Sequence, residues 1–189
     1  MEKPLARLVS TAGHPAVLMP AAAVIASPNR FAGIALAISL GCAALVLAYS
    51  LYKTRTGQWA HIDASAPSER LELNSQIGTV FLVVAVILWL TKIHAGVSVV
   101  VGLSGLILVV GHLLRRVAKL SLHVAFAVFA ALLVWPNHLA TATLVAIALA
   151  VSWSRISLHR HNATDVILGA LVGAIAGFAF HYLMSRLAT

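Results

Sequence analysis

Long apolar runs separated by short polar connections make up most of the chain. The runs cover, approximately, His14–Ser27, Phe31–Tyr52, Ile77–Thr91, Gly96–Leu114, Leu120–Trp135, Leu139–Trp153 and Asp165–Met184. A membrane-spanning helix needs about 20 mainly apolar residues, and lipid offers the backbone no hydrogen-bond partner outside a helix. The pattern therefore predicts an all-α fold, a polytopic membrane helix bundle of six or seven transmembrane helices.

The first run is the least regular of the seven. It contains Pro15 and Pro20, and the polar sequence that begins at Ser27 cuts it off. Proline inside a helix removes a backbone hydrogen bond and bends the chain, so we expect this segment to be kinked or only partly inserted. Lys3 and Arg7 precede it in the manner of a signal peptide, but we interpret it as a membrane segment. This segment is the reason that the predicted count is six or seven.

Composition supports a membrane protein and excludes most other classes. The chain has 189 residues, of which 61% are hydrophobic and 10% charged, and its mean hydropathy is +0.97. Soluble domains carry about 45–50% apolar and about 25% charged residues, so a soluble enzyme, a secreted disulfide scaffold and a disordered protein are excluded. The length allows one domain over residues 1–189. The single cysteine, Cys42, lies in an apolar run, where we expect it to pack.

Charge is concentrated in a few polar connections. The chain has 13 Lys and Arg residues against 5 Asp and Glu residues, a net charge of +8. The basic residues lie between apolar runs, which indicates contact with anionic lipid or phosphate rather than with nucleic acid. If every run from residue 31 onward spans, one side of the membrane receives the long connections 53–76, 115–119 and 154–164. We expect the chemistry on this side; the positive-inside rule favours the cytoplasm, with the orientation itself left open.

The last of these connections carries the most specific cluster. His161 and Asp165 are four residues apart and therefore share one face of a helix. A carboxylate there can accept the proton of one imidazole nitrogen, so that the other nitrogen can act as a nucleophile. Both residues lie where the last helix begins, and the N-terminus of a helix favours a bound anion. Arg155 offers a planar guanidinium to phosphate oxygens. The three groups together indicate phosphoryl transfer.

The other two connections add groups of similar chemistry. Ser121 can cap a helix and bind a phosphate oxygen, and His123 can protonate a leaving alkoxide. Lys119 adds a cation beside them, and Arg70 adds a second guanidinium from the connection 53–76. For the other histidines we prefer interfacial or headgroup contacts; these are His14, His61, His94, His112, His138, His159 and His181.

These clusters resemble the signatures of the type-2 phosphatidic acid phosphatase superfamily, which also includes the vanadium haloperoxidases. The third signature of that family, S-R-x5-H-x3-D, is matched in full from Ser154 to Asp165. The second, P-S-G-H, is matched by the Ser and His of Leu120–His123, without the Pro and Gly. The first, K-x6-R-P, keeps its Arg as Arg70, while Asp63 replaces the Lys and a leucine replaces the Pro. The resemblance covers approximately residues 63–184.

The resemblance implies a metal-independent membrane phosphatase without a cofactor, acting on a lipid phosphate or diphosphate. It implies that His161 attacks phosphorus to form a phosphohistidine, that Asp165 orients His161, and that His123 protonates the leaving oxygen and then activates water. The phosphate would be held by Arg70, Arg155, Ser121 and the backbone near Leu122. The expected partners are the phosphorylated lipid and other membrane lipids, and the expected location is the bacterial inner membrane.

Asp63 is the departure from the family with the largest consequence. A carboxylate does not bind phosphate and lowers the affinity for a dianion beside it, so we expect Asp63 to turn away and orient Arg70 or another base. The missing cation must then come from elsewhere. Lys119 precedes Ser121 and His123 closely, so we expect its flexible ammonium to replace the family's lysine on the phosphate. Contact of Lys119 with lipid headgroups is the alternative.

Two other functions remain open from the sequence. The altered first and second signatures are compatible with a non-catalytic protein of the same fold that binds or scrambles phospholipids. The 9 histidines permit a membrane haem protein, although those in the apolar runs show no paired spacing across helices. A soluble phosphate ester is a further possible substrate, but a site at helix ends near the headgroups favours a lipid, whose identity the sequence leaves open.

Overall fold

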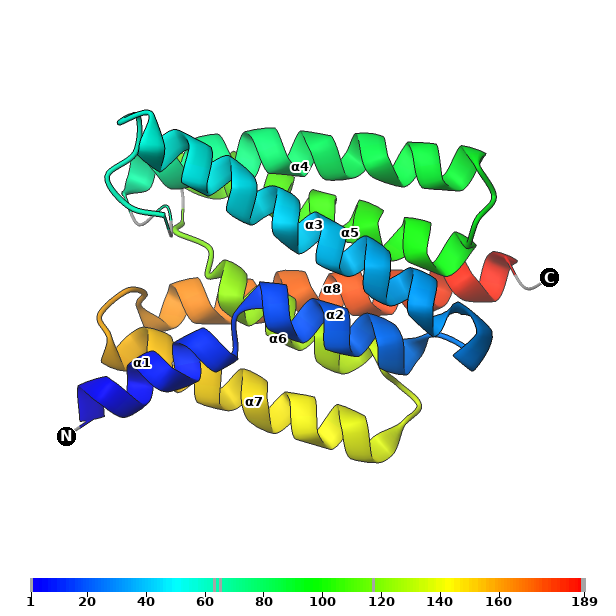
Figure 1. Cartoon of the computed structure of the whole chain (residues 1–189). Coiled ribbons are helices and arrows are strands. Elements are labelled where there is room, and N and C mark those ends of the chain that lie inside the picture. Colours follow the sequence, from blue (N-terminus) through cyan, green and yellow to red (C-terminus); the bar gives the residue numbers. More distant parts are fainter. Residues whose placement is uncertain (1, 63, 65, 117, 188–189) are drawn as a thin grey trace.

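The computed structural model describes residues 2–62, 64, 66–116 and 118–187. All regular structure among these residues is helical (Figure 1). The elements are α1 (Glu2–Ala12), α2 (Pro15–Ala26), α3 (Asn29–Arg55), α4 (Pro67–Leu90), α5 (Ala95–Leu113), the short 3₁₀ helix η1 (Leu114–Arg116), α6 (Leu122–Leu133), α7 (His138–Ser157) and α8 (Ala163–Leu187). The predicted all-α class is confirmed.

Five of the helices are long and apolar enough to cross a membrane, namely α3, α4, α5 with η1, α7 and α8. The pair α1 and α2 makes a sixth span if it is counted as one, although it is bent by 42° at the break between the two helices. These spans confirm the predicted polytopic membrane bundle. The predicted run Leu120–Trp135 contains α6, a helix of 12 residues that is shorter than a full span. Among the described residues there are therefore five spans, or six with the bent pair, against the six or seven predicted.

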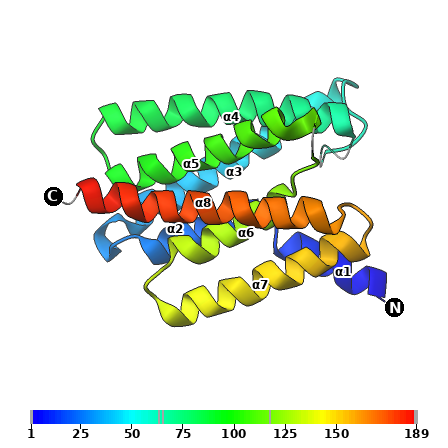
Figure 2. The same cartoon turned by 180° about the vertical axis from the view of Figure 1, so that it is seen from behind.

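α6 is shorter than a span and is surrounded by protein. It packs against α2, α5, α7 and α8 in the middle of the bundle (Figures 1 and 2). Most of its residues are buried, including the large side chains Phe126, Phe129 and Leu133. A helix enclosed by its neighbours has its apolar surroundings supplied by protein, so its length does not have to match the thickness of the lipid.

The polar connections alternate between the two ends of the bundle. The connections from α3 to α4, from η1 to α6 and from α7 to α8 lie at the end where α1 begins, and α8 ends at the opposite end (Figures 1 and 2). This arrangement agrees with the alternation expected from consecutive spans. It brings the three polar clusters of the sequence to one end of the molecule, which we call the polar end.

A stripe of glycines on α8 packs closely on α6, as the spacing of Gly169, Gly173 and Gly177 predicts. A Cβ atom added at Gly169 would meet the carbonyl oxygen of Ser121, and one added at Gly173 would meet the carbonyl oxygen of Ala125. The stripe therefore lets the backbones of α6 and α8 approach each other. It also fixes the position of the α7–α8 loop relative to the start of α6.

Gly173→Ala is expected to destabilise the bundle, because the new methyl group would overlap a backbone carbonyl oxygen of α6. Overpacking of this kind costs about 1–3 kcal/mol. Gly41→Ala is the matched control, since an added Cβ at Gly41 has nothing within 4 Å and alanine favours a helix over glycine. Thermal unfolding in detergent should show a lower Tm for Gly173→Ala alone. Equal Tm values for the two variants would contradict close packing of α6 on α8.

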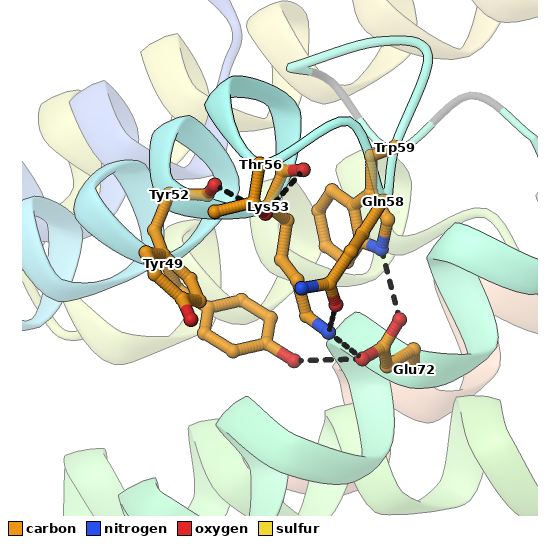
Figure 3. A network of polar contacts seen from close by, with 7 residues as sticks. All are labelled: Tyr49, Tyr52, Lys53, Thr56, Gln58, Trp59 and Glu72. Carbon is orange, nitrogen blue, oxygen red and sulfur yellow. Dashed lines mark hydrogen bonds and ion pairs between the residues drawn. The ribbon is translucent and has the colours of Figure 1, made fainter.

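α3 is the least enclosed of the spans, with two buried residues among its 27. Its C-terminal end is tied to α4 by a polar network around Glu72 (Figure 3). Glu72 accepts hydrogen bonds from the Tyr49 hydroxyl at 3.2 Å and from the Trp59 indole N–H at 2.9 Å, and it pairs with the Lys53 ammonium. The network holds the α3–α4 loop at the polar end.

Candidate active site

The α7–α8 loop is fixed by hydrogen bonds at both of its ends. At the start of α8, Asp165 Oδ2 accepts from the Asn162 N–H at 3.1 Å, and Asn162 Oδ1 accepts from the Asp165 N–H at 2.8 Å. At the end of α7, the carbonyl oxygen of Arg155 accepts from the N–H groups of Arg160 and His161, at 3.1 and 3.2 Å. The loop therefore holds His161 in one place between the two helices.

His161 and Asp165 lie in contact, although His161 is in the α7–α8 loop before α8 begins and does not share a helix face with Asp165 as predicted. Nδ1 of His161 lies 3.4 Å from Oδ2 of Asp165 and 3.1 Å from the carbonyl oxygen of Lys119. The two side chains are 5% and 8% exposed. Because both neighbours of Nδ1 are acceptors, Nδ1 carries the proton of the neutral imidazole. The lone pair is then on Nε2, which is the tautomer that nucleophilic attack by Nε2 requires.

Asp165 also fixes the segment that leads into α6. Its Oδ1 accepts from the Lys119 N–H at 3.2 Å, and its backbone carbonyl oxygen accepts from the Ser121 N–H at 3.1 Å. One acidic residue therefore joins α8, the loop before it and the start of α6.

The surroundings of His161 keep its imidazole neutral. Burial is the largest cause, followed by the positive charges of Arg155 and Lys119. Together they lower the pKa of His161 from 6.5 to about 4, against the opposing effect of Asp165. Near pH 7 the Nε2 lone pair is therefore not blocked by a proton.

The lowered pKa of His161 predicts a loss of stability in mild acid. Between pH 6.5 and about 4, His161 is protonated in the unfolded chain and neutral in the folded chain. The unfolded state then binds more protons, so the free energy of unfolding decreases as the pH falls. Thermal unfolding measured across this window should show the decrease, and the decrease should be smaller in His161→Ala. The same pH dependence in both proteins would contradict the lowered pKa.

A cavity of about 200 Å³ lies beside His161 and extends into the bundle. Its polar end is lined by His14, Arg70, His123, Arg155 and His161. Its inner walls are apolar and come from α2 to α6; they include Met19, Val46, Ile77, Phe81, Leu108 and Phe126. The cavity therefore joins a basic, histidine-rich end to an apolar interior, and we call it the main cavity.

α1 holds the end of α7 that carries Arg155. The Arg155 side chain is buried and its Nη1 donates to Ser10 Oγ at 3.0 Å, while Ser154 Oγ donates to the carbonyl oxygen of Ala6 at 2.6 Å. The sequence patterns predict no part in the site for α1. The available signal was a face of small residues, Ala6, Ser10 and Gly13, which is buried where α1 packs on α7.

Lys119 lies beside the main cavity rather than in its lining. It lines a second cavity of about 220 Å³, which shares Arg70 with the main cavity. Its Nζ donates to the carbonyl oxygen of Arg160 at 2.8 Å, and burial followed by the charge of Arg70 lowers the pKa of Lys119. The backbone of Lys119, rather than its ammonium, contacts the His161–Asp165 pair. Its contact with phosphate stays a prediction.

The remaining predicted residues are distributed differently. Leu122 and His123, at the start of α6, line the main cavity. Ser121 is the N-cap of α6 and is fully buried beside Gly169. Its hydroxyl has no hydrogen-bond partner within the part of the chain that the structure describes, and it does not line the main cavity. Asp63 lies outside the described residues.

His14 lines the main cavity although we expected it to be an interfacial residue. Its ring meets the ring of His123 edge to face, with centroids 5.0 Å apart and an interplanar angle of 86°. His14 lies between Gly13 and Pro15, where α1 ends and α2 begins. Pro15 predicts a kink in this run, but no sequence pattern indicates that the kink faces α6.

Within residues 2–62, 64, 66–116 and 118–187, no group of three or more His, Cys, Asp or Glu side chains is arranged to hold a metal ion. No family model, no curated protein and no solved structure matches this chain. The functional interpretation therefore depends on the residues and the geometry of the main cavity.

Proposed function

We propose that the chain is a metal-independent membrane phosphatase that hydrolyses a lipid phosphate or diphosphate through a phosphohistidine intermediate. The main cavity carries the proposal, because it places His161, His123 and two arginines at one end of an apolar interior. A lipid phosphate has the same division into an anionic head and an apolar tail. A soluble phosphate ester would leave the apolar walls without a partner, at a cost in hydrophobic free energy.

In the first step, Nε2 of His161 attacks phosphorus, so that a P–N bond forms and the bond from phosphorus to the lipid oxygen breaks. His123, which takes up a proton from water when the anionic phosphoryl group binds beside it, donates that proton to the lipid oxygen. The oxygen leaves as the lipid alcohol, or as the lipid monophosphate when the substrate is a diphosphate. Arg70 and Arg155 face the same cavity, and their guanidinium groups stabilise the charge on the phosphoryl oxygens in the transition state.

In the second step, His123 takes a proton from a water molecule that attacks the phosphohistidine. The P–N bond breaks, phosphate leaves, and the lone pair returns to Nε2 of His161. Asp165 keeps its position beside Nδ1 throughout and stabilises the positive charge that the imidazole acquires when Nε2 is bonded to phosphorus.

A non-catalytic protein that binds or scrambles phospholipids is the second candidate. The position of Ser121 favours it, because a buried hydroxyl outside the lining of the main cavity has to turn before it can bind a phosphate oxygen. Phosphate contacts of Ser121, Lys119 and the backbone near Leu122 are part of the phosphatase proposal. Phosphate release separates the two candidates.

The bacterial inner membrane is the location we propose within the broader class of multi-pass membrane proteins. Helical bundles are typical of that membrane, whereas the bacterial outer membrane holds β-barrels. The basic connections at the polar end favour a cytoplasmic site by the positive-inside rule.

The purified chain is expected to release phosphate from at least one member of a panel of lipid phosphates, and a chelator is expected to leave the rate unchanged. The panel contains phosphatidate, phosphatidylglycerophosphate, a polyprenyl diphosphate and a lipid-A-type phosphate. The physical reason is that arginines supply the positive charge that Mg²⁺ supplies elsewhere. Activity that disappears with EDTA and returns with Mg²⁺ would contradict the mechanism, and absence of release from the whole panel would favour the second candidate.

A further inference from the structure

The break between α1 and α2 places an additional histidine in the main cavity. The two helices are bent by 42°, and Gly13 at the break packs against Val151, where an added Cβ would overlap the valine side chain. Pro15 then begins α2. His14 is therefore the residue that turns the chain, and its side chain faces α6 instead of continuing a helical face.

The hydrogen bond of His14 fixes its tautomer. Nδ1 accepts from the N–H of Ala16 at 3.1 Å and so caps the N-terminus of α2. A neutral imidazole whose Nδ1 accepts a hydrogen bond carries its proton on Nε2. His14 therefore brings an Nε2–H donor into a cavity that it shares with Arg155 and His161.

His94 provides an internal comparison, because it makes the same cap elsewhere. Its Nδ1 accepts from the N–H of Val97 at 3.3 Å at the N-terminus of α5. Its ring packs against Phe31, with centroids 4.4 Å apart, at the end of the bundle opposite the polar end (Figure 1). Capping therefore explains the Nδ1 bond of both histidines. The place of His14 in the main cavity, beside the ring of His123, is not required by capping.

We propose that His14 is a phosphate-binding residue, whose Nε2–H donates to an oxygen of the terminal phosphoryl group of the lipid. This inference deepens the proposed function and rests on it. His14 supplies an Nε2–H donor among the lining residues of the main cavity, which include Arg155 and His161. The phosphoryl group then lies among His14, Arg155 and His161.

The first test compares His14→Asn with His94→Asn. Asparagine caps helices as well as any residue, so both variants keep a cap and lose an imidazole. With a short-chain phosphatidate as substrate, His14→Asn should raise KM by about tenfold or more, and His94→Asn should leave KM within about twofold of the wild type. Equal KM values for the two variants would overturn the inference and leave His14 as a helix cap only.

The second test needs no turnover and uses the native Cys42, which lines the same cavity from α3. Alkylation of Cys42 by N-ethylmaleimide is followed with dioctanoyl phosphatidate present, and with dioctanoyl glycerol as the lipid without phosphate. Phosphatidate should protect the thiol at lower concentration than dioctanoyl glycerol in the wild type and in His94→Asn. In His14→Asn, the ratio between the protecting concentrations of dioctanoyl glycerol and phosphatidate should be about tenfold smaller than in the wild type.

The two tests separate the two proposals. If the wild type releases no phosphate from the lipid panel but phosphatidate protects Cys42 in a His14-dependent manner, the phosphatase proposal fails and the phosphate-binding role of His14 stands. If the wild type releases phosphate, and neither KM nor the protection of Cys42 changes in His14→Asn, the proposed role of His14 is wrong and the phosphatase proposal stands. Equal protection by the two lipids in the wild type would overturn the inference about His14.

Discussion

Purified His161→Ala is expected to release no measurable phosphate from any lipid that the wild-type chain hydrolyses. The substitution removes the Nε2 lone pair that is proposed to bond to phosphorus, and loss of a nucleophile that acts together with its partners lowers kcat by at least ~10⁴-fold. Asp165 and Arg155 keep contacts that do not involve the imidazole, so the bundle should still fold. Phosphate release and circular dichroism on the same sample measure both properties.

His159→Asn is the matched control for this substitution. His159 is exposed in the same loop, and its backbone has a φ of 52°, a conformation that asparagine adopts more readily than most residues. This variant should keep the wild-type rate within a few-fold. Activity of His161→Ala within about tenfold of the wild type would remove His161 from the role of nucleophile.

Asp165→Asn is expected to lower kcat by about 10³–10⁴-fold, close to the effect of the same change in serine-protease triads. The carboxylate accepts from the N–H groups of Lys119 and Asn162 and lies beside Nδ1 of His161. An asparagine amide has one acceptor oxygen, so its NH₂ group must face one of these donors, and the negative charge that favours a proton on Nδ1 is lost. Steady-state kinetics at a temperature where the variant is folded measure the effect on kcat.

Asn162→Ser separates the capping function of this turn from its chemistry. Serine keeps a hydroxyl that can accept the N–H of residue 165, which the Asn162 side chain now binds at 2.8 Å, and serine is a good N-cap. A small fall in Tm with kcat within a few-fold of the wild type is expected. If Asn162→Ser and Asp165→Asn lose the same factor in kcat, the carboxylate contributes only to the structure of the turn.

The sequence predicts the fold well because lipid restricts the possible structures. Each apolar run became a helix, since only helices satisfy the backbone in hydrocarbon. The boundaries were harder to predict where polar residues are helical: α4 begins at Pro67 rather than at Ile77. Glu69 and Glu72 lie in this first part of α4 and hold the α3–α4 loop, Glu69 through the N–H of Ala60 at 2.6 Å. In the sequence these acidic residues are typical of a loop. In the structure they lie in α4 and bind the α3–α4 loop.

The candidate site was predictable only where its contacts are local. His161 and Asp165 are only four residues apart, so the short turn from the α7–α8 loop into α8 brings them into contact. The hydrogen bond from the Lys119 N–H to Asp165 joins residues 46 positions apart. No periodic pattern in a single sequence indicates a contact over that separation. The contact between His14 and His123 likewise depends on how α2 packs on α6. Tertiary packing therefore decides which histidines share the cavity.

The shortness of α6 has a consequence for which molecules can be attacked. Its 12 residues extend over about 18 Å at about 1.5 Å per residue, whereas the hydrocarbon layer is about 30 Å thick. α6 begins well inside the ends of α7 and α8 (Figure 1), and its first turn carries His123. On the phosphatase proposal, we therefore expect a terminal phosphate to reach His123 and a diester that carries a bulky alcohol to be excluded. Discrimination between monoesters and diesters then follows from the length of one enclosed helix rather than from any single contact with the headgroup.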